Sequence, residues 1–223
     1  MHVEPPKEPL ASLREFGLHY LMIVVSILTA LGLEEALRFR HDSEAARLAE
    51  QSIEREVFAN LQDLRDAIKQ NEGRIAAMHK LGDALAEDIR RQPAADLQKK
   101  VKEELDGKLS IGLTLPGQSH EAWDVAVASQ AAVHIPRDKL EAYAASYSMV
   151  RDTITAANAG IVMMDGPRLI DMISDIEIGV IDPKRSFELI RQSEAVNGSA
   201  LGNLKAAESE ITKALDKAGV HKS

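Results

Sequence analysis

FGLHYLMIVVSILTALGL, residues 16–33, contains no Asp, Glu, Lys or Arg. As an α-helix this stretch is about 27 Å long, close to the roughly 30 Å thickness of a bilayer's hydrocarbon core. Its many Leu, Ile and Val side chains favour insertion into lipid, and the polar side chains of His19, Tyr20, Ser26 and Thr29 oppose it only in part. The stretch predicts a transmembrane anchor helix over residues 14–40, with residues 16–33 in contact with the lipid bilayer.

Two other interpretations of residues 16–33 stay open at the level of sequence. A cleavable signal peptide fits less well, because the N-terminal region is acidic and no small-residue cleavage site precedes Glu34. A buried core helix also fits less well, because such a helix is rarely apolar around its whole circumference for five turns. Phe16 and Tyr20 lie at one end of the stretch and Phe39 lies just beyond the other end, where membrane interfaces concentrate aromatic side chains.

The orientation of the anchor is not decided by the basic residues that flank it. Cytoplasmic flanks of a span carry an excess of Lys and Arg. Here Lys7 and Arg14 on one side stand against Arg38, Arg40 and Arg47 on the other, and the two counts nearly balance.

The composition limits the class of protein. The chain has 223 residues, no cysteine, 4% aromatic residues and a formal net charge of −8. Abundant Ala, Leu and Glu with few aromatic residues favour helix over strand. The absence of cysteine excludes disulfides and thiolate metal sites. Because phosphate backbones are bound by clustered Lys and Arg, and no long basic run is present, we expect no nucleic-acid partner.

Apolar residues beyond the anchor recur at helical spacing over about nine turns. They are Val57, Leu61, Leu64, Ile68, Ile75, Met78, Leu85 and Ile89. This spacing places them on one face of a helix, so we expect the anchor to continue without a linker into a long amphipathic helix. Arg90 and Arg91, followed by Pro93, predict where that helix ends.

Glycine and proline divide the remaining chain into further helices. We expect a short helix over 94–106 and a loop over 110–119, followed by a helix with Ser119 as its N-cap. Pro136 is expected at the first position of the next helix, and acid-before-proline signals at 165–167 and 182–183 predict two restarts. Five or six helices predict an all-α antiparallel helical bundle over residues 41–220, behind a disordered N-terminal tail at 1–13.

Few residues carry a signal for chemistry. The glycine-containing motifs that bind phosphates or build a hydrolase nucleophile are absent from the sequence. A dense acidic stretch between Asp165 and Asp182 is interpreted as a solvated helix face rather than a metal site. We therefore expect no enzymatic activity, no cofactor and no metal ligands.

Two sets of residues are candidates for binding. Trp123, Tyr143 and Tyr147 fall in a predicted helical hairpin, where large aromatic side chains form either a ligand pocket or a core. Ser26 and Ala30 are one helical turn apart in the anchor, and such pairs of small residues let two transmembrane helices approach closely. These two residues are the candidate dimerisation face of the span.

Two stretches carry a resemblance to known proteins: IVVSILTALGLEEALRFRHDSEAARLAEQSIEREVFANLQDL (23–64) and HEAWDVAVASQAAVHIPRDKLEAYAASYSMV (120–150). They resemble a family of uncharacterised bacterial single-pass inner-membrane proteins. In that family a span that reads like V-x-x-S-I-L-x-A-L leads into a charged helix ending in E-x-x-x-N-L, here Glu56, Asn60 and Leu61. A later hairpin carries a tryptophan and then a tyrosine, which match Trp123 and one of the two tyrosines named above. The resemblance implies a bacterial inner-membrane anchor and a periplasmic helical domain, and it implies no activity.

These observations predict a membrane-anchored helical bundle that serves as a non-enzymatic scaffold or interaction protein of the bacterial envelope. It would act through a protein partner or a second copy of itself. The alternative is a periplasmic ligand-sensing bundle with a pocket near the three aromatic residues. Because the sequence offers one span, that sensor would need a partner to relay its signal.

Overall fold

The computed structural model describes residues 13–91, 112–178, 180 and 182–222. Within these residues the protein is all-α and has no strand, which confirms the predicted fold class. The elements are α1 (Leu13–Arg91), α3 (Glu121–Ala128), the 3₁₀-helix η1 (Ala131–His134), α4 (Arg137–Glu177) and α5 (Pro183–Lys217). The tail predicted at the N-terminus, up to residue 12, and the helix predicted over 94–106 lie outside the described residues.

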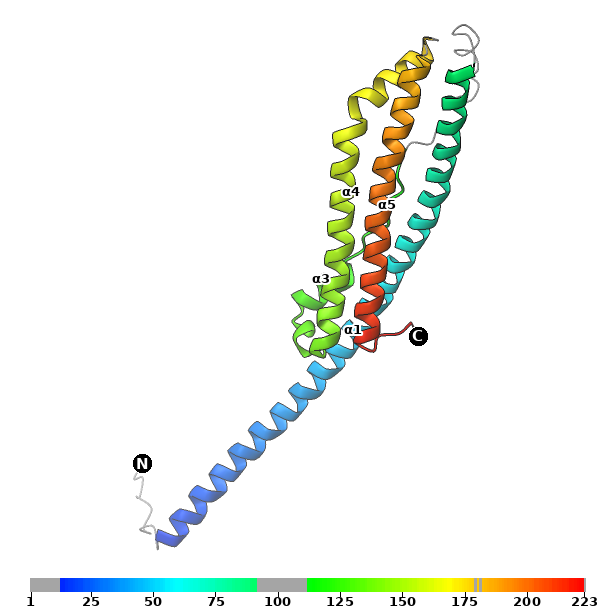
Figure 1. The fold of residues 1–223 in the computed structure, drawn as a ribbon. Helices are drawn as coiled ribbons and strands as arrows, with labels where there is room; N and C mark the ends of the chain where they lie inside the picture. The colour runs from blue at the N-terminus through cyan, green and yellow to red at the C-terminus, as the bar shows by residue number, and fades with distance from the viewer. Residues whose placement is uncertain (1–12, 92–111, 179, 181, 223) are drawn as a thin grey trace, which may run out of the picture.

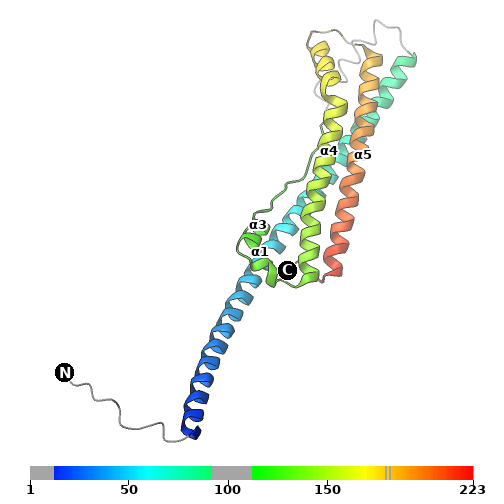
Figure 2. The same cartoon turned by 90° about the vertical axis from the view of Figure 1, so that its left-hand side faces the viewer.

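Three long helices form an elongated bundle from which the first part of α1 projects (Figure 1). α1 and α4 run in the same direction, and α5 returns between them, so both neighbours of α5 are antiparallel to it. Figure 2 shows α3 and the C-terminus at the base of the bundle, next to the point where α1 enters it. The prediction of antiparallel packing holds for both long interfaces.

α1 is a single helix of 79 residues that joins the apolar stretch to the bundle without a break. The predicted apolar face is confirmed: Val57, Leu61, Leu64, Met78 and Leu85 are buried, and Ile68, Ile75 and Ile89 are half-buried. The helix ends at Arg91, where two arginines interact favourably with the negative end of its dipole. Its first buried residue is Ala46, so the bundle begins about one turn beyond the predicted boundary at residue 41.

The core of the bundle has two parts along its length. The larger part lies toward the base and includes the fully buried side chains of Ile53, Tyr143, Leu204 and Ile211. The smaller part joins the far ends of α1 and α5 through Met78, Leu85 and Ile190. The helices associate because they bury aliphatic side chains together. Each fully buried side chain contributes on the order of 1.5–3 kcal/mol.

The predicted start signals were partly right. Asp182 is the N-cap of α5, because its carboxylate accepts hydrogen bonds from the backbone N–H groups of Lys184 and Arg185, and Pro183 is the first helical residue. Pro136 precedes the first residue of α4 by one position, and its carbonyl accepts the first helical hydrogen bond, from Leu140.

Two predicted boundaries were wrong. α3 begins after His120, and Ser119 does not cap it because the backbone of Ser119 is bound by a side chain of α1 instead. α4 runs through residues 165–167 without a restart. Proline keeps a helical φ angle and removes one hydrogen bond, so a helix can continue through it with a bend. The upper part of α4 is bent (Figure 1).

Candidate functional site

The sequence motifs converge on the base of the bundle, where an extended segment and α3 lie against α1. We call residues 112–120 the strap. Two asparagines of α1 bind the backbone of the strap, each with one donated and one accepted hydrogen bond, as a neighbouring peptide group would. The amide of Asn71 donates to the carbonyl of Thr114 at 2.7 Å and accepts from the N–H of Thr114 at 2.8 Å. Asn60 makes the same pair of bonds with Ser119, at 2.7 and 3.1 Å.

The spacing of these residues explains why both pairs form together. Asn60 and Asn71 are eleven residues apart, so they lie on one face of α1, about 16.5 Å apart along its axis. Thr114 and Ser119 are five residues apart, and an extended chain covers that interval in about 16.5–17 Å. The strap therefore fits in register along α1, and each buried asparagine satisfies a donor and an acceptor of the strap backbone.

Glu56 joins three elements through one carboxylate. It accepts hydrogen bonds from the backbone N–H of Ala122, at 3.0 and 3.2 Å, in the first turn of α3. It also accepts from the phenol of Tyr147 on α4, at 2.5 Å. A carboxylate is well placed at a helix N-terminus because unpaired N–H groups and the helix dipole favour negative charge there. Glu56 thus replaces the side-chain cap that His120 does not provide.

Acidic residues of α1 also bind α4 in a regular series. Glu50 pairs with Lys139, and Glu54 accepts a hydrogen bond of 2.9 Å from the phenol of Tyr143. Both pairs have the same offset in sequence and are one helical turn apart, as expected for parallel neighbouring helices. Burial, followed by the hydrogen bond to Glu54, raises the pKa of Tyr143 far above its ordinary value. Tyr143 is therefore a neutral donor that holds α4 to α1.

The three predicted aromatic residues lie in the large core. Tyr143 is fully buried, and Trp123 and Tyr147 pack against the same core with ring centroids 5.5 Å apart and planes tilted by 46°. Burial and the bond to Glu56 raise the pKa of Tyr147 strongly as well. These side chains connect α3 and α4 to α1. The ligand-binding alternative at this place stays a prediction.

Two surface grooves, each of about 620 Å³, lie elsewhere on the described surface. The first lies on α1 beside the C-terminal tail and includes Glu54, Phe58 and Lys222 in its lining. The second lies between α4 and α5 and is mostly apolar, with Ala145, Met149 and Ala207 among its lining residues. Neither groove has one of the three predicted aromatic residues in its lining.

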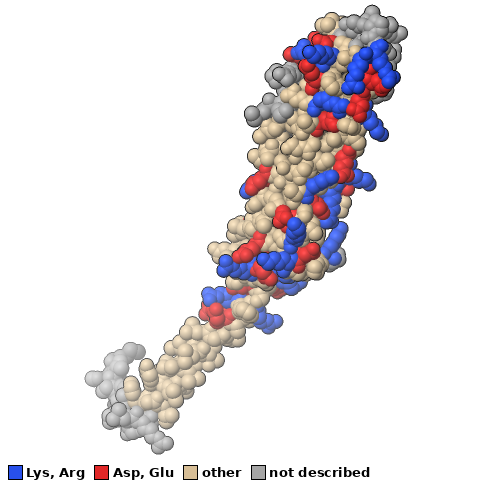
Figure 3. Space-filling model, viewed as in Figure 1, with Lys and Arg blue, Asp and Glu red and all other residues tan. Residues whose placement is uncertain are grey.

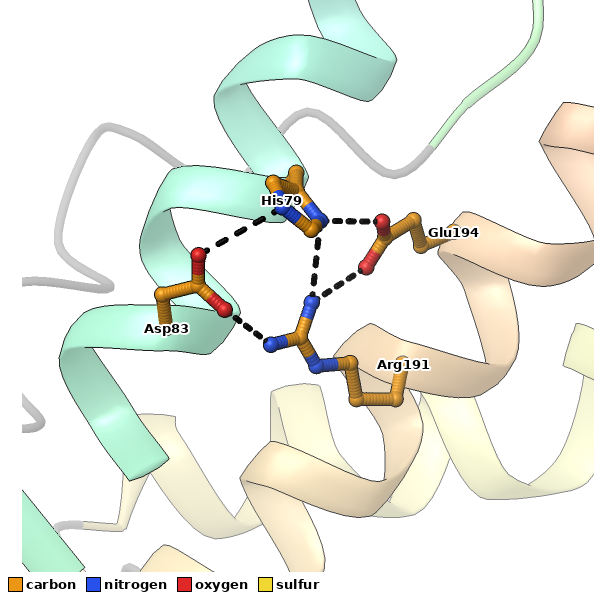
Figure 4. Close-up of polar contacts among 4 residues, drawn as sticks. All are labelled: His79, Asp83, Arg191 and Glu194. Carbon is orange, nitrogen blue, oxygen red and sulfur yellow. Dashed lines mark hydrogen bonds and ion pairs between the residues drawn. The ribbon is translucent and has the colours of Figure 1, made fainter. Parts of the chain in front are cut away.

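A charged network joins the far ends of α1 and α5 (Figure 4). Arg191 of α5 binds Asp83 of α1 and, at 2.7 Å, Glu194 one turn farther along its own helix. His79 lies between both carboxylates, 2.7 Å from Glu194 and 3.4 Å from Asp83. The guanidinium also lies over the ring of Phe187, 5.5 Å from its centroid. Gly82 permits this approach, because a Cβ there would lie 2.9 Å from the guanidinium carbon.

Hydrogen bonds set the charge states in this network. The hydrogen bond from Arg191 lowers the pKa of Asp83 below its ordinary value. Burial acts to raise the pKa of Glu194, but hydrogen bonds from Arg191 and His79 outweigh it, so that pKa is lowered too. Both carboxylates are therefore ionised at neutral pH and pair with the arginine.

The acidic stretch before α5 also has a structural partner. Arg185 contacts Asp171 at 2.9 Å and Asp175 at 3.2 Å. These two carboxylates of the acidic stretch therefore hold the start of α5 to the end of α4. In the part of the chain that the structure describes, no group of three or more His, Asp or Glu side chains is arranged to hold a metal ion.

No residue of the predicted anchor segment between positions 16 and 40 is buried, and all of them except Val24 are largely exposed. Its most apolar window of 18 residues has a mean hydropathy of 2.0, and none of it is buried. The visible face of this segment has no charged atoms until α1 approaches the bundle (Figure 3). Ser26 donates its hydroxyl to the carbonyl of Met22 at 2.8 Å, which leaves no unpaired donor on the candidate face with Ala30. Dimerisation through this face stays a prediction.

Sequence reasoning singled out some of these residues and missed others. The E-x-x-x-N-L motif marked Glu56 and Asn60, which bind α3 and the strap. Asn71 and the network around Arg191 were not found, because their partners are distant in sequence and the residues alone resemble ordinary surface positions. No protein-family model, curated protein or solved structure matches the chain.

Proposed function

We propose that this protein is a single-pass protein of the bacterial inner membrane whose helical bundle acts as a scaffold for other proteins of the envelope. The span is the first part of α1, and the bundle lies on the periplasmic side. Its role is to hold a binding surface at a set distance and orientation from the membrane, without catalysing a reaction.

One observation carries the proposal: residues 16–33 are apolar, entirely unburied and continuous with the helix that forms the bundle. A core helix of a soluble protein would be covered by its neighbours, whereas this segment exposes large side chains such as Leu21, Leu28 and Leu31 by more than half. An exposed apolar surface of this size is costly in water and favourable in lipid. Cleavage as a signal peptide would have to cut within one continuous helix.

The non-enzymatic role is supported by what the polar residues do. Glu54, Glu56 and Asn60 are partly or fully buried. Glu54 is hydrogen-bonded to α4, Glu56 to α3 and Asn60 to the strap. These hydrogen bonds hold the elements at the base of the bundle in fixed positions. The periplasmic location is supported by the resemblance noted above, since the basic residues beside the span do not decide it.

Membrane extraction tests the anchor. In a bacterial host expressing the full chain, the protein should stay in the pellet after alkaline carbonate treatment and be released only by detergent. A matched variant, Leu28→Arg with Ile27→Arg, should shift a substantial fraction to the supernatant, because each buried arginine costs on the order of 3 kcal/mol. Release of the unmodified protein by carbonate alone would remove the proposal.

A pull-down from detergent-solubilised membranes tests the scaffold role. The full chain should retain one or a few envelope proteins in fixed proportion. Variants of exposed residues at the far end of the bundle, away from the membrane, should reduce that retention selectively. A chain that stays a monomer with no stoichiometric partner under conditions that preserve its fold would contradict the proposal.

A further inference from the structure

Glycines occur in all three long helices at one level of the bundle. We call them the glycine belt: Gly73 of α1, Gly160 of α4, and Gly198 and Gly202 of α5. Toward the base, Glu72 of α1 pairs with Lys205 of α5 at 2.6 Å. Toward the far end, His79 lies 2.7 Å from Glu194. The belt glycines of α1 and α5 fall between these two contacts, and a Cβ on the glycine of α4 would lie 3.9 Å from the side chain of Val196, at the same level of α5.

Neither packing nor backbone conformation requires glycine at these positions. A Cβ on Gly73, Gly198 or Gly202 would have no described atom within 4 Å, and one on Gly160 would make only an ordinary van der Waals contact. Gly219, outside the belt, is the only glycine with a positive φ among the described residues. Glycine inside a helix weakens it relative to alanine, because glycine loses more conformational freedom on folding. Each long helix is therefore easier to bend at the belt than elsewhere.

The belt coincides with the break between the two parts of the core. Residues 69–74 of α1, KQNEGR, contain no apolar side chain. Residues 191–203 of α5 belong to neither part of the core, and the most deeply buried of them are the polar Ser193 and Asn197. Segments with few buried apolar contacts are those at which proteins open locally. The far part of the bundle is thus coupled to the base by less apolar packing than holds the base itself together.

The described part of the strap braces α1 from the belt to the base. Gly112, where the described strap begins, accepts a hydrogen bond from Arg74 at 3.1 Å. From there the strap follows α1 toward the base, as far as the bonds between Ser119 and Asn60. Residues 75–91 of α1, which we call the far arm, lie beyond the strap.

A small apolar cluster and the network around Arg191 hold the far arm to α5 (Figure 4). Met78, Leu85 and Ile190 are the buried side chains of the cluster. On the far arm, the side chains of His79 and Asp83 are 57% and 59% exposed, so water reaches the network. Exposed ion pairs contribute little to stability, and they break and form again readily.

We propose that the far arm and the facing part of α5 open and close, with the glycine belt as the hinge and the network around Arg191 as the latch. In the closed state Met78, Leu85 and Ile190 are covered, as in this structure. In the open state they are exposed at the far end of the bundle, so opening changes the surface that this end presents. The base stays closed because the strap and the larger part of the core hold it. The hinge does not depend on whether residues 16–33 span a membrane.

Because the chain contains no cysteine, pairs of spin labels can be placed at will. Glu87→Cys with Glu188→Cys is the far pair, between the ends of α1 and α5. Gln62→Cys with Lys213→Cys is the base pair, between the same two helices on the other side of the belt. All four positions are exposed, and ion pairs between the two helices put the members of each pair at similar heights. Double electron–electron resonance on the full chain in non-ionic detergent measures both distance distributions, and circular dichroism checks that each variant keeps its helical content.

The far pair should give a shorter and a longer distance, and the base pair a single one. Gly73→Ala, Gly198→Ala and Gly202→Ala combined should reduce the longer-distance fraction by about tenfold or more, because alanine stiffens each helix at a position with open space. Arg191→Gln should increase that fraction several-fold by releasing the latch. Gly32→Ala is the matched control, because it is an equally open glycine of α1 outside the bundle, and it should change neither distribution.

A single narrow distance for the far pair, unaffected by Arg191→Gln, would overturn the proposal. A longer distance that persists unchanged in the triple alanine variant would overturn the belt as the hinge. Equal broadening of the base pair and the far pair would mean that the whole bundle loosens, which also overturns the proposal.

Discussion

Individual polar side chains hold the elements of this protein in place. Asn60 and Asn71 bind the strap through paired hydrogen bonds, and Glu56 supplies the cap of α3 from another helix. Buried polar groups are worth little when satisfied and are costly when left without a partner. The largest effects of substitution at this scale should therefore come from removing one member of a buried pair.

Asn71→Ala should destabilise the bundle by about 2–4 kcal/mol, because it leaves the N–H and the carbonyl of Thr114 without partners in a partly buried place. The exposed neighbour Lys69, substituted by alanine, should change stability by less than about 0.5 kcal/mol. Chemical denaturation of both full-length variants in non-ionic detergent, followed by circular dichroism, measures the difference. Equal stability of the two variants would contradict the role of Asn71.

The network around Arg191 at the far end of the bundle should lose its contribution to the free energy of unfolding in acid. The folded-state pKa values of Asp83 and Glu194 are lowered, so their stabilisation is present above the unfolded values of about 4 and disappears as pH falls through the folded values. Arg191→Gln should therefore flatten the fall in stability below about pH 5.

Thermal unfolding of Arg191→Gln and of the unmodified protein from pH 7 to pH 3 checks this effect. Lys213→Gln is the control, because Lys213 pairs with an exposed neighbour on its own helix. Parallel pH profiles for Arg191→Gln and the unmodified protein would show that the network does not contribute.

The helices show which structural features the sequence could predict and which it could not. The spacing from Val57 to Leu85 predicted one buried face, and it is buried because that spacing alone decides which side of a helix meets the core. The signal at 165–167 predicted a break that α4 does not have, since local propensity does not determine whether a helix bends or ends. The partners of Asn60 and Asn71 could not be predicted, because the strap's path along α1 depends on tertiary packing.

α1 should tolerate a kink between the span and the bundle but not within the bundle. Arg40→Pro breaks the helix before Ala46, its first buried residue, so the thermal stability of the bundle should change little. Gln62→Pro, at an exposed position within the bundle, should cost about 3 kcal/mol or more. Thermal unfolding in detergent separates the two. A loss for Arg40→Pro as large as for Gln62→Pro would show that the projecting segment is part of the cooperative unit.

At the scale of the whole molecule, one helix links the exposed apolar segment to the bundle. If this segment is the span that we propose, the rigid link fixes the height of the base of the bundle above the bilayer, and the curve of α1 fixes how the bundle is inclined to the span (Figure 1). No flexible linker allows these to vary, because α1 is helical from Leu13 to Arg91. The geometry suits a protein that presents a surface at a defined distance from the bilayer.

The most direct test of the proposed membrane span and its orientation is cysteine accessibility in bacterial cells that are permeabilised only in the outer membrane. Single cysteines at Ile27, His41 and Lys7 are treated with a membrane-impermeant maleimide before and after lysis. The account predicts that His41→Cys reacts in intact cells, that Lys7→Cys reacts only after lysis, and that Ile27→Cys stays protected until detergent is added. Free reaction of Ile27→Cys without detergent would contradict the membrane span, and the reverse pattern for His41→Cys and Lys7→Cys would place the bundle in the cytoplasm.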